Sequence, residues 1–246
     1  MLSVEAVSKR FGGLLAVSDV TMRVAPGSIS GLIGPNGAGK TTLFTMISGF
    51  ERPTSGRILF DGRDITGTAP EVLAAAGIAR TFQIVQPFAG LSVIENVAVG
   101  AYLRHPGRRE ALARAEAVAD LVGLGSLGQP ASSLTVAGRK RLELARALAT
   151  EPRLLLLDEV LAGLNPSEIR DIIPVVQAIR ASGVTILMIE HVMQAVMSLC
   201  EHVHVIANGQ TIASGAPSAI VGDPKVVEAY LGHGAAERLA GRAAHG

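Results

Sequence analysis

The sequence has little of three features that would place the chain in other protein classes. It contains one cysteine, Cys200, which excludes an internal disulfide and suits a reducing compartment such as the cytoplasm. It has no run of roughly 18 apolar residues, so we expect no membrane-spanning helix. Its 22 basic and 21 acidic residues give a net charge of +1, which does not support nucleic-acid binding. Residues 1–11 alternate apolar and polar side chains, which predicts a strand rather than a signal peptide.

The stretch 28–49 carries the clearest functional signal. Within it, residues 34–41 match the pattern G-x-x-x-x-G-K-[ST] at every fixed position. The apolar run 29–33 predicts a buried strand before the pattern, and 41–48 predicts the first turns of a helix after it. The backbone N–H groups of such a loop, together with the positive end of the helix dipole, suit a polyphosphate. The phosphate-binding residues that we predict are Gly34, Pro35, Asn36, Gly37, Ala38, Gly39, Lys40, Thr41 and Thr42.

Two residues at the end of this loop have distinct expected roles. Lys40 can reach the outer phosphates, and the hydroxyl of Thr41 can bind Mg²⁺. The glycines allow the backbone to approach the phosphates closely. The spacing differs from G-x-G-x-x-G, so a dinucleotide such as NAD is a poor candidate.

A second motif places two carboxylates after a buried strand. The apolar run 154–157 predicts that strand, and Asp158 and Glu159 follow it directly. A carboxylate at this end of a strand lies where nucleotide-binding α/β sheets hold Mg²⁺, so Asp158 is a candidate metal ligand. Glu159 can hold and deprotonate a water aimed at the γ-phosphate. An acidic pair can also simply cap a strand, but the phosphate loop in the same chain favours the metal and water roles.

The 246 residues suffice for one large α/β domain with a subdomain insert. Strands are predicted at 2–7, 16–24, 29–33, 56–60, 78–82, 154–157, 184–189 and on both sides of the turn Asn208-Gly209. Further helices are predicted at 70–76, 93–103, 109–121, 139–150, 166–182, before Cys200 and in two short C-terminal segments. We therefore predict a domain over 1–232, a helical subdomain over about 84–150, and a flexible tail over 233–246.

In this order, the motifs resemble those of the nucleotide-binding subunit of an ATP-binding-cassette (ABC) transporter, over residues 2–232. The resemblance implies an α/β fold, with a P-loop NTPase core sheet, an N-terminal antiparallel β subdomain and an inserted α-helical subdomain. It makes 34–41 the Walker A loop, 154–158 the Walker B strand and Glu159 the general base. ATP and Mg²⁺ are the implied cofactors.

The resemblance assigns roles to further residues. Gln83 matches the Q-loop glutamine, a ligand of Mg²⁺ and of the attacking water that also connects the catalytic site to the insert. His191 matches the switch histidine, which contacts the γ-phosphate and orients Glu159. Phe11 matches the aromatic residue that stacks on adenine, and Asn165 stands in the D-loop where an aspartate is usual. Each residue alone could be polar surface or core, and only their joint order favours these roles.

The signature motif departs from the family pattern L-S-G-G-Q. Residues 134–138 read L-T-V-A-G, before a helix that matches the family closely. Thr135 keeps a hydroxyl for the γ-phosphate, Ala137 replaces a glycine whose N–H approaches that phosphate, and Gly138 replaces the glutamine. An alanine N–H can still donate from a helix N-terminus, so we expect a working site whose strength stays open. The basic run 139–141 is interpreted as a solvated helix face rather than a nucleic-acid patch.

Within the family, the chain is most similar to the ATPase subunits of bacterial branched-chain (hydrophobic) amino-acid importers. The segments that carry this similarity are 80–83, 91–100, 162–166, 189–191 and 227–231. The related branch that drives lipopolysaccharide export is less similar. Related importers carry amides or urea, so these cargoes stay open.

The family architecture implies a head-to-tail dimer, with ATP between the Walker A face of one subunit and the signature helix of the other. A homodimer and a heterodimer with a second ABC ATPase subunit are both open. The implied partners are integral membrane permease subunits, one of which would insert a short helix near 83–96, and, indirectly, a periplasmic binding protein. Nucleic acid is not among them. The implied location is peripheral, at the cytoplasmic face of the inner (plasma) membrane.

Three other classes of protein fit the sequence less well. A soluble ABC ATPase of translation or DNA repair would need a second cassette or a coiled-coil insert, and neither pattern occurs in these 246 residues. A small-molecule kinase would share the phosphate loop. It would lack Gln83, the signature helix and the pairing of Glu159 with that loop. A non-hydrolysing binding module would follow only if the altered signature were inactive.

Overall fold

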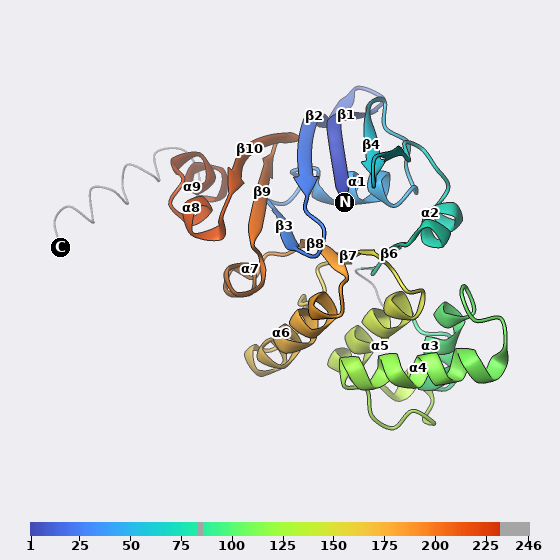
Figure 1. The fold of residues 1–246 in the computed structure, drawn as a ribbon. Helices are drawn as coiled ribbons and strands as arrows, with labels where there is room; N and C mark the ends of the chain where they lie inside the picture. Colours follow the sequence, from blue (N-terminus) through green and yellow to red (C-terminus); the bar gives the residue numbers. More distant parts are fainter. Residues whose placement is uncertain (83–85, 232–246) are drawn as a thin grey trace, which may run out of the picture.

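The computed structural model describes residues 1–82 and 86–231 of the chain. One group of strands comprises β3 (Ile29–Ile33), β6 (Ile78–Arg80), β7 (Leu154–Asp158), β8 (Thr185–Ile189), β9 (His202–Ala207) and β10 (Gln210–Gly215). The other comprises β1 (Leu2–Phe11), β2 (Leu14–Val24), β4 (Ser55–Phe60) and β5 (Arg63–Asp64). The first group forms a six-stranded sheet in the order β10-β9-β3-β8-β7-β6, and the second a four-stranded sheet in the order β2-β1-β4-β5. Figure 1 shows both sheets.

The six-stranded sheet forms the centre of the molecule. Strands β9, β3, β8, β7 and β6 pair in parallel, and β10 joins the edge antiparallel. Every residue of β3, β7 and β8 is buried, which explains why these strands appear as continuous apolar runs in the sequence. Because the carboxyl ends of parallel strands meet at one edge, the residues that follow β3, β7 and β8 are brought together there.

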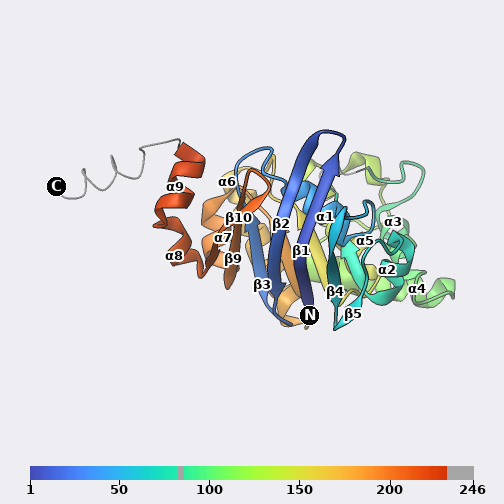
Figure 2. The ribbon, with the colours of Figure 1, turned by 90° about the horizontal axis from the view of Figure 1, so that it is seen from above.

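The four-stranded sheet is antiparallel and covers helix α1 (Lys40–Ile47). Buried side chains from both sheets and from α1 form one apolar cluster, to which Val4, Phe44 and Leu156 belong. In Figure 2 strands β2, β1 and β4 run side by side, and α1 lies behind them. This packing fixes α1, and with it the loop that precedes it.

Strands β1 and β2 are longer than the predicted 2–7 and 16–24. Ala6 has a φ of 51°, and the register of the pair shifts between Val4 and Val7. These are the marks of a β-bulge, which breaks the strict alternation of inward and outward side chains. The sequence pattern therefore fails at residue 7, although the strand continues to Phe11.

Helices cover the six-stranded sheet and extend beyond it. They are α2 (Pro70–Ala76), α3 (Val93–Ala101), α4 (Arg108–Val122), α5 (Val136–Ala149), α6 (Pro166–Ala181), α7 (Met193–Leu199), α8 (Pro217–Val221) and α9 (Pro224–Leu231). A short 3₁₀ turn, Ala131–Ser133, precedes α5. In the ranges 1–82 and 86–231, no helix combines the length and the apolar character needed to cross a membrane.

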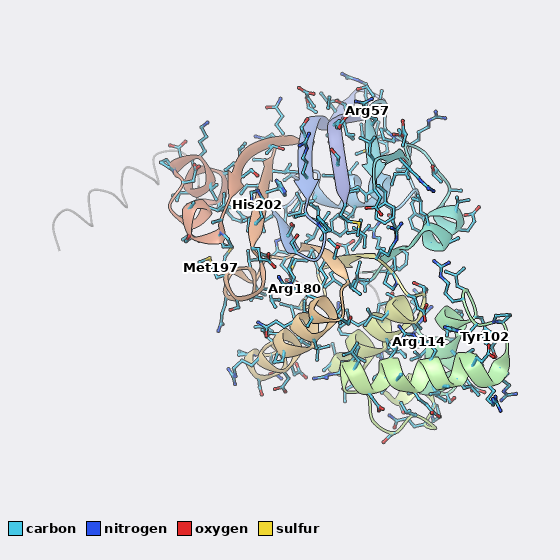
Figure 3. All side chains as sticks on the ribbon, in the orientation of Figure 1. Arg57, Tyr102, Arg114, Arg180, Met197 and His202 are labelled. Carbon is cyan, nitrogen blue, oxygen red and sulfur yellow. The ribbon has the colours of Figure 1, made fainter. Side chains whose placement is uncertain are left out.

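Helices α3, α4 and α5 pack against one another and lie away from the four-stranded sheet (Figure 1). Arg114 of α4, labelled in Figure 3, pairs with Glu151 just after α5, with 3.2 Å between Nε and Oε1. The limits of the helical subdomain, about 84–150, and of the domain at 232 stay predictions. Gln83 and the tail 233–246 lie outside the described residues.

Two predicted helix starts are confirmed, and one of them has a side-chain cap. Helix α6 begins after Asn165, whose side chain accepts hydrogen bonds from the N–H groups of Ser167 and Glu168. Glu168 bonds back to the Asn165 N–H, which completes a capping box. Helix α2 spans Pro70–Ala76, as predicted, and its first residue is a proline, which is common at that position.

Helix α5 begins earlier than the predicted residue 139. The hydroxyl of Thr135 accepts a hydrogen bond from the N–H of Gly138 at 3.1 Å, and the first helical residue is Val136. Valine and glycine are weak helix formers, so propensity alone disfavours a helical turn here. The cap at Thr135 overrides that preference.

Candidate functional site

The phosphate loop connects the end of β3 to the start of α1. Gly34 (φ 152°), Gly37 (φ 78°) and Gly39 (φ 102°) all have positive φ. A Cβ at Gly34 would lie 1.9 Å from the carbonyl oxygen of Ile206, and one at Gly39 would lie 2.6 Å from that of Ala16. Only glycine therefore fits at positions 34 and 39.

Lys40 is the first residue of α1 and is only 5% exposed. Its Nζ donates hydrogen bonds to the carbonyl oxygens of Gly34 at 2.7 Å and Pro35 at 2.9 Å. Burial lowers the pKa of the Lys40 ammonium, and the carboxylates of Glu159 and Asp158 oppose that shift. Both hydrogen bonds go to neutral oxygens, so the loop holds a buried positive charge for which a phosphate is a stronger partner.

Asp158 ends β7 and is 3% exposed. Its Oδ2 accepts a hydrogen bond from Nη2 of Arg80 at 2.7 Å, and its N–H donates to Oγ1 of Thr81 at 3.1 Å. Asp158 and Thr41 line the same cavity, which has a volume of about 800 Å³. The predicted metal ligands Asp158 and Thr41 are thus brought together.

A carboxylate and a hydroxyl are hard oxygen ligands, which Mg²⁺ prefers. Among the described residues, no three or more His, Cys, Asp or Glu side chains form a group that could hold a metal ion. Mg²⁺ in nucleotide sites is usually bound through one or two protein ligands together with substrate phosphates. The donor set of Thr41 and Asp158 fits that mode of binding.

Glu159 and His191 are in direct contact. His191 Nε2 and Glu159 Oε1 are 2.6 Å apart. Ile189, at the end of β8, pairs with Asp158 of β7, and its carbonyl oxygen accepts a hydrogen bond from the Glu159 N–H at 3.0 Å. Glu159 also has a φ of 50°, a conformation that is uncommon for residues other than glycine. Sequence reasoning placed both residues at the site but gave no signal for this backbone conformation.

The interpretation of 139–141 as a solvated helix face is wrong for its central residue. Lys140 is 7% exposed, and its Nζ donates a hydrogen bond to the carbonyl oxygen of Glu159 at 3.2 Å. Arg141 is half-buried and donates to the carbonyl oxygen of Val122. Successive residues of a helix are about 100° apart around its axis, so three in a row cannot share one face. Lys140 is therefore a site residue that sequence reasoning missed.

Two more polar residues at this edge of the sheet were missed. Arg80 was used in the sequence analysis only as part of the segment 80–83 that resembles the importer ATPases. In the structure its guanidinium is bonded to Asp158. Glu190 is buried, and its Oε1 accepts a hydrogen bond from the Leu161 N–H at 3.0 Å. Burial raises the pKa of Glu190 to about 6. Both interactions join residues far apart in the chain, so no local pattern signals them.

Phe11 lies at the tip of the β1–β2 hairpin and is 44% exposed. The Nζ of Lys9 is 4.8 Å from the centre of its ring. The same hairpin places the Ala16 carbonyl against Gly39 of the phosphate loop. The hairpin therefore lies beside the loop, and the stacking of Phe11 on adenine stays a prediction.

The signature residues lie on a different element. Thr135, Ala137 and Gly138 form the cap and first turn of α5, and the Thr135 hydroxyl is bonded to the Gly138 N–H. Across the part of the chain that the structure describes, no hydrogen bond joins them to the phosphate loop.

Comparison with known families adds an independent result. The family model described as "ABC transporter" matches residues 17–162. A second model, described as "Branched-chain amino acid ATP-binding cassette transporter", matches residues 210–236. The first match spans the phosphate loop, the Walker B strand and all of α3, α4 and α5.

Curated relatives match over nearly their whole length. The chain is 40% identical over 249 residues to "High-affinity branched-chain amino acid transport ATP-binding protein LivG" of Escherichia coli K12, covering 94% of this chain and 98% of the relative. It is 39% identical over 250 residues to the protein BraF of Pseudomonas aeruginosa, with the same coverage. A probable LivG of Archaeoglobus fulgidus is 37% identical over 245 residues, covering 94% of this chain and 95% of that relative.

Solved structures agree with these relatives. A nucleotide-free ATP-binding cassette from an ABC transporter has a TM-score of 0.85 and 33% identity, covering 94% of this chain and 98% of its own. The ADP conformation of an ATP-binding cassette of an ABC transporter has a TM-score of 0.85 and 34% identity, covering 95% and 99%. The predicted α/β fold with its P-loop core is confirmed. Together with the family match, these relatives show that the chain belongs to the ABC transporter family, as one of its ATP-hydrolysing cassettes.

Proposed function

We propose that this chain is the ATP-hydrolysing subunit of a branched-chain amino-acid importer. The printed names of the relatives and the family match at 210–236 support this cargo class. The alternative cargoes, amides, urea or exported lipopolysaccharide, are not favoured by these relatives. The observation that carries the hydrolytic role is the 2.6 Å contact between Glu159 and His191, at the sheet edge that also carries Lys40 and Asp158.

In the proposed reaction, Glu159 is the general base. Its carboxylate accepts the proton of the water that attacks the γ-phosphate. His191 holds one carboxylate oxygen and so fixes the direction from which the proton is taken. The same histidine can contact the γ-phosphate once the nucleotide is bound.

The remaining residues bind and orient the nucleotide. Lys40 exchanges its two carbonyl partners for oxygens of the outer phosphates, which are stronger acceptors. Mg²⁺, when bound, would neutralise charge on the outer phosphates and would be held by Thr41 and Asp158, with Gln83 as a further ligand. Phe11 would stack on adenine.

We also propose that two cassettes associate head to tail, so that the signature residues of one act on the ATP of the other. Thr135, Ala137 and Gly138 of this chain would then contact the partner's γ-phosphate. The partner is either a second copy of this chain or a second ABC ATPase subunit. Integral membrane permease subunits at the cytoplasmic face of the membrane, and indirectly a periplasmic binding protein, would complete the transporter. The names of the relatives as transport ATP-binding proteins support this assembly.

Steady-state hydrolysis of Mg-ATP, measured against the concentration of purified protein, tests the function. Specific activity that rises with concentration indicates a self-assembling dimer with a working signature. Bound ATP without turnover at any concentration indicates an obligate second subunit. A chain that neither binds nor hydrolyses ATP contradicts the proposal.

The cargo class needs a separate experiment. The Glu159→Gln variant, loaded with Mg-ATP, serves as bait for membrane subunits from the native membrane. The recovered complex, assembled with the wild-type chain in vesicles, is tested for uptake of labelled leucine, acetamide and urea. Uptake of leucine alone supports the proposed cargo, and uptake of only an amide or urea contradicts it.

A further inference from the structure

The guanidinium of Arg80 connects two elements of the nucleotide site. Its Nη2 donates a hydrogen bond to Oδ2 of Asp158 at 2.7 Å, and its Nη1 donates to Oγ of Ser48 at 3.1 Å. Ser48 directly follows α1, and its hydroxyl is fixed by donating to the Phe44 carbonyl at 2.6 Å. Arg80 therefore ties the end of the Walker B strand to the end of the helix that begins at the phosphate loop.

This ion pair is shielded from water. The side chains of Arg80 and Asp158 are 7% and 4% exposed. The guanidinium carbon lies 5.9 Å from the centre of the Phe44 ring and 5.5 Å from that of Phe82. Phe82 in turn packs edge-on against Phe50, with 5.7 Å between ring centres. Because both side chains are nearly fully buried, solvent screens their attraction only weakly, and the guanidinium favours one direction of the carboxylate.

The backbone of Asp158 is fixed independently of the arginine side chain. The Thr81 N–H donates to the Leu156 carbonyl at 2.9 Å, and the Asp158 N–H donates to the Thr81 hydroxyl at 3.1 Å. With the main chain held in this way, the remaining freedom of Asp158 is rotation of its side chain. The bond from Arg80 removes that freedom.

A contribution to the free energy of unfolding is a weak explanation for the buried Arg80–Asp158 ion pair. A buried ion pair often contributes little net stability, because desolvation of both charges offsets their attraction. Among residues 1–82 and 86–231, no atom accepts a hydrogen bond from the buried Nε–H of Arg80, which is unfavourable in itself. What the pair does provide is a fixed orientation for a carboxylate of which only one oxygen, Oδ2, is engaged by the guanidinium.

We propose that Arg80 is a positioning residue for Mg²⁺ binding, which holds Asp158 by Oδ2 so that its other oxygen is presented to the metal beside Thr41. This inference rests on the proposed role of Asp158 as a metal ligand. Groups that orient a metal ligand through such a bond typically contribute about 10- to 100-fold to metal affinity. Arg80 itself touches neither metal nor nucleotide in this role.

The experiment measures binding of a fluorescent ADP analogue, once with EDTA and once with excess Mg²⁺. The Mg²⁺ ratio is the dissociation constant in EDTA divided by the dissociation constant in Mg²⁺. It reports how much the metal strengthens nucleotide binding, without any turnover. For Arg80→Met we expect the dissociation constant in EDTA to stay within about threefold of wild type and the ratio to fall about 10-fold or more. An unchanged or higher ratio overturns the proposal, because an arginine that only repels Mg²⁺ would raise it.

Arg153→Met is the matched control. Arg153 also pairs with an aspartate, Asp61, and its guanidinium also lies over a phenylalanine, Phe60, at 4.7 Å from the ring centre. That pair is exposed, so its loss should leave the Mg²⁺ ratio at the wild-type value. Ser48→Ala removes the second anchor of Arg80 and should lower the ratio about two- to threefold.

A charge-conserving variant covers the case in which Arg80→Met fails to fold. Lysine at 80 keeps the positive charge but replaces the planar fork by one compact ammonium group. It cannot hold Asp158 and Ser48 with the geometry of the guanidinium, so we expect Arg80→Lys to lower the ratio about threefold or more. A wild-type ratio in Arg80→Lys overturns the proposal, since charge alone would then suffice.

A double-mutant cycle separates this inference from the proposed function. If Asp158 binds the metal, Asp158→Asn lowers the Mg²⁺ ratio by itself, and Arg80→Met adds no further loss in that background. An unchanged ratio in Asp158→Asn contradicts the metal role of Asp158. A lowered ratio in Asp158→Asn with additive losses in the double variant supports the metal role but overturns the proposal for Arg80.

Discussion

Two regions of the molecule are built in different ways. The phosphate edge is the part of the six-stranded sheet where the residues after β3, β7 and β8 meet, and the helical group consists of α3, α4 and α5. At the phosphate edge the backbone has positive φ at Gly34, Gly39 and Glu159, and buried charges lie close to one another. The interior of the helical group is made largely of small side chains. Its buried alanines are Ala98, Ala101, Ala111, Ala115, Ala119, Ala145, Ala147 and Ala149. Small side chains allow the helices to approach closely, and such an interface has little room for added volume.

The contacts between the two regions show what this difference means. The Lys140 Nζ of α5 is bonded to the Glu159 carbonyl, and the Glu143 Oε1 of α5 accepts a hydrogen bond from the Phe82 N–H at 3.3 Å. Helix α5 thus contacts this edge of the sheet at two points. One contact is at the proposed base, Glu159, and the other is at Phe82, directly before Gln83. The edge of the sheet carries the buried charges and the unusual backbone conformations that can interact with a ligand. The closely packed helices provide a fixed support for it.

The largest expected effect is at the phosphate edge. Glu159→Gln should lower turnover about 10²- to 10⁴-fold and leave ATP affinity nearly unchanged, because the amide cannot accept a proton but still bonds to His191. Turnover and ATP binding are measured separately. Glu116→Gln, on the exposed face of α4, is the control and should behave as wild type. Near-wild-type turnover in Glu159→Gln would remove this residue from the role of base.

The second effect concerns affinity rather than turnover. Lys40→Ala removes the buried ammonium from the phosphate loop, so affinity for ADP should fall about 10- to 100-fold. The melting temperature without nucleotide should change little, because relief of a desolvated charge offsets the loss of its two hydrogen bonds to carbonyl oxygens and of its attraction to Asp158 and Glu159. Calorimetric titration and thermal melting measure the two quantities, with exposed Lys225→Ala as the control. Unchanged ADP affinity would count against the phosphate loop.

A third prediction concerns the sheet itself and its dependence on pH. Burial lowers the pKa of His204 to about 4, and its Nε2 lies 3.1 Å from the Arg23 carbonyl oxygen of β2. The unfolded chain therefore binds a proton more readily, so His204 destabilises the fold progressively as the pH falls from about 6.5 to about 4. The loss amounts to at most about 3 kcal/mol of unfolding free energy.

His204→Gln should flatten this pH dependence, whereas Ser198→Ala, at an exposed position of α7 without a titratable group, should leave it as it is. Urea unfolding at about pH 7.5 and about pH 5 measures the difference. His202, labelled in Figure 3, shares the bridging hydroxyl of Ser214 with His204 and stays in place in both variants. If the unfolding free energy changes equally with pH in the wild type and in His204→Gln, the lowered pKa assigned to His204 is wrong.

The smallest expected effect tests the helical group. Alanine usually stabilises a helix relative to glycine by about 1 kcal/mol. At Gly100 of α3, however, the added Cβ would lie 2.3 Å from the Arg146 carbonyl oxygen of α5. Gly100→Ala should therefore destabilise the chain by about 1–3 kcal/mol while leaving ADP affinity unchanged. Gly222→Ala, where nothing lies within 4 Å, is the control, and stabilisation by Gly100→Ala would contradict the close packing.

Sequence reasoning was most successful where a few adjacent residues determine the structure. The phosphate loop and the buried strand before Asp158 follow from short patterns, and Asn165 marks the start of α6 by its own side chain. The end of β1 could not be located, because the bulge at Ala6 breaks the period of two on which strand recognition depends.

Other parts of the site depend on contacts between distant segments. Arg80 and Asp158 are separated by 78 residues in the sequence, and Lys140 and Glu159 by 19. No spacing rule connects such pairs, since only the sheet order brings β6 beside β7. The solvated face expected at 139–141 failed because successive helical residues point about 100° apart, and only the fold shows that Lys140 is the one that faces the Glu159 carbonyl.

The positive φ of Glu159 has a consequence for the evolution and engineering of this chain. A glutamate in that conformation is less favourable than a glycine, by roughly 1 kcal/mol. Substitution of Glu159 by glycine would relieve that strain and, at the same step, remove the proposed base. Selection for thermal robustness and selection for turnover therefore act in opposite directions at this one residue, and a thermostable variant that keeps its activity must gain its stability elsewhere.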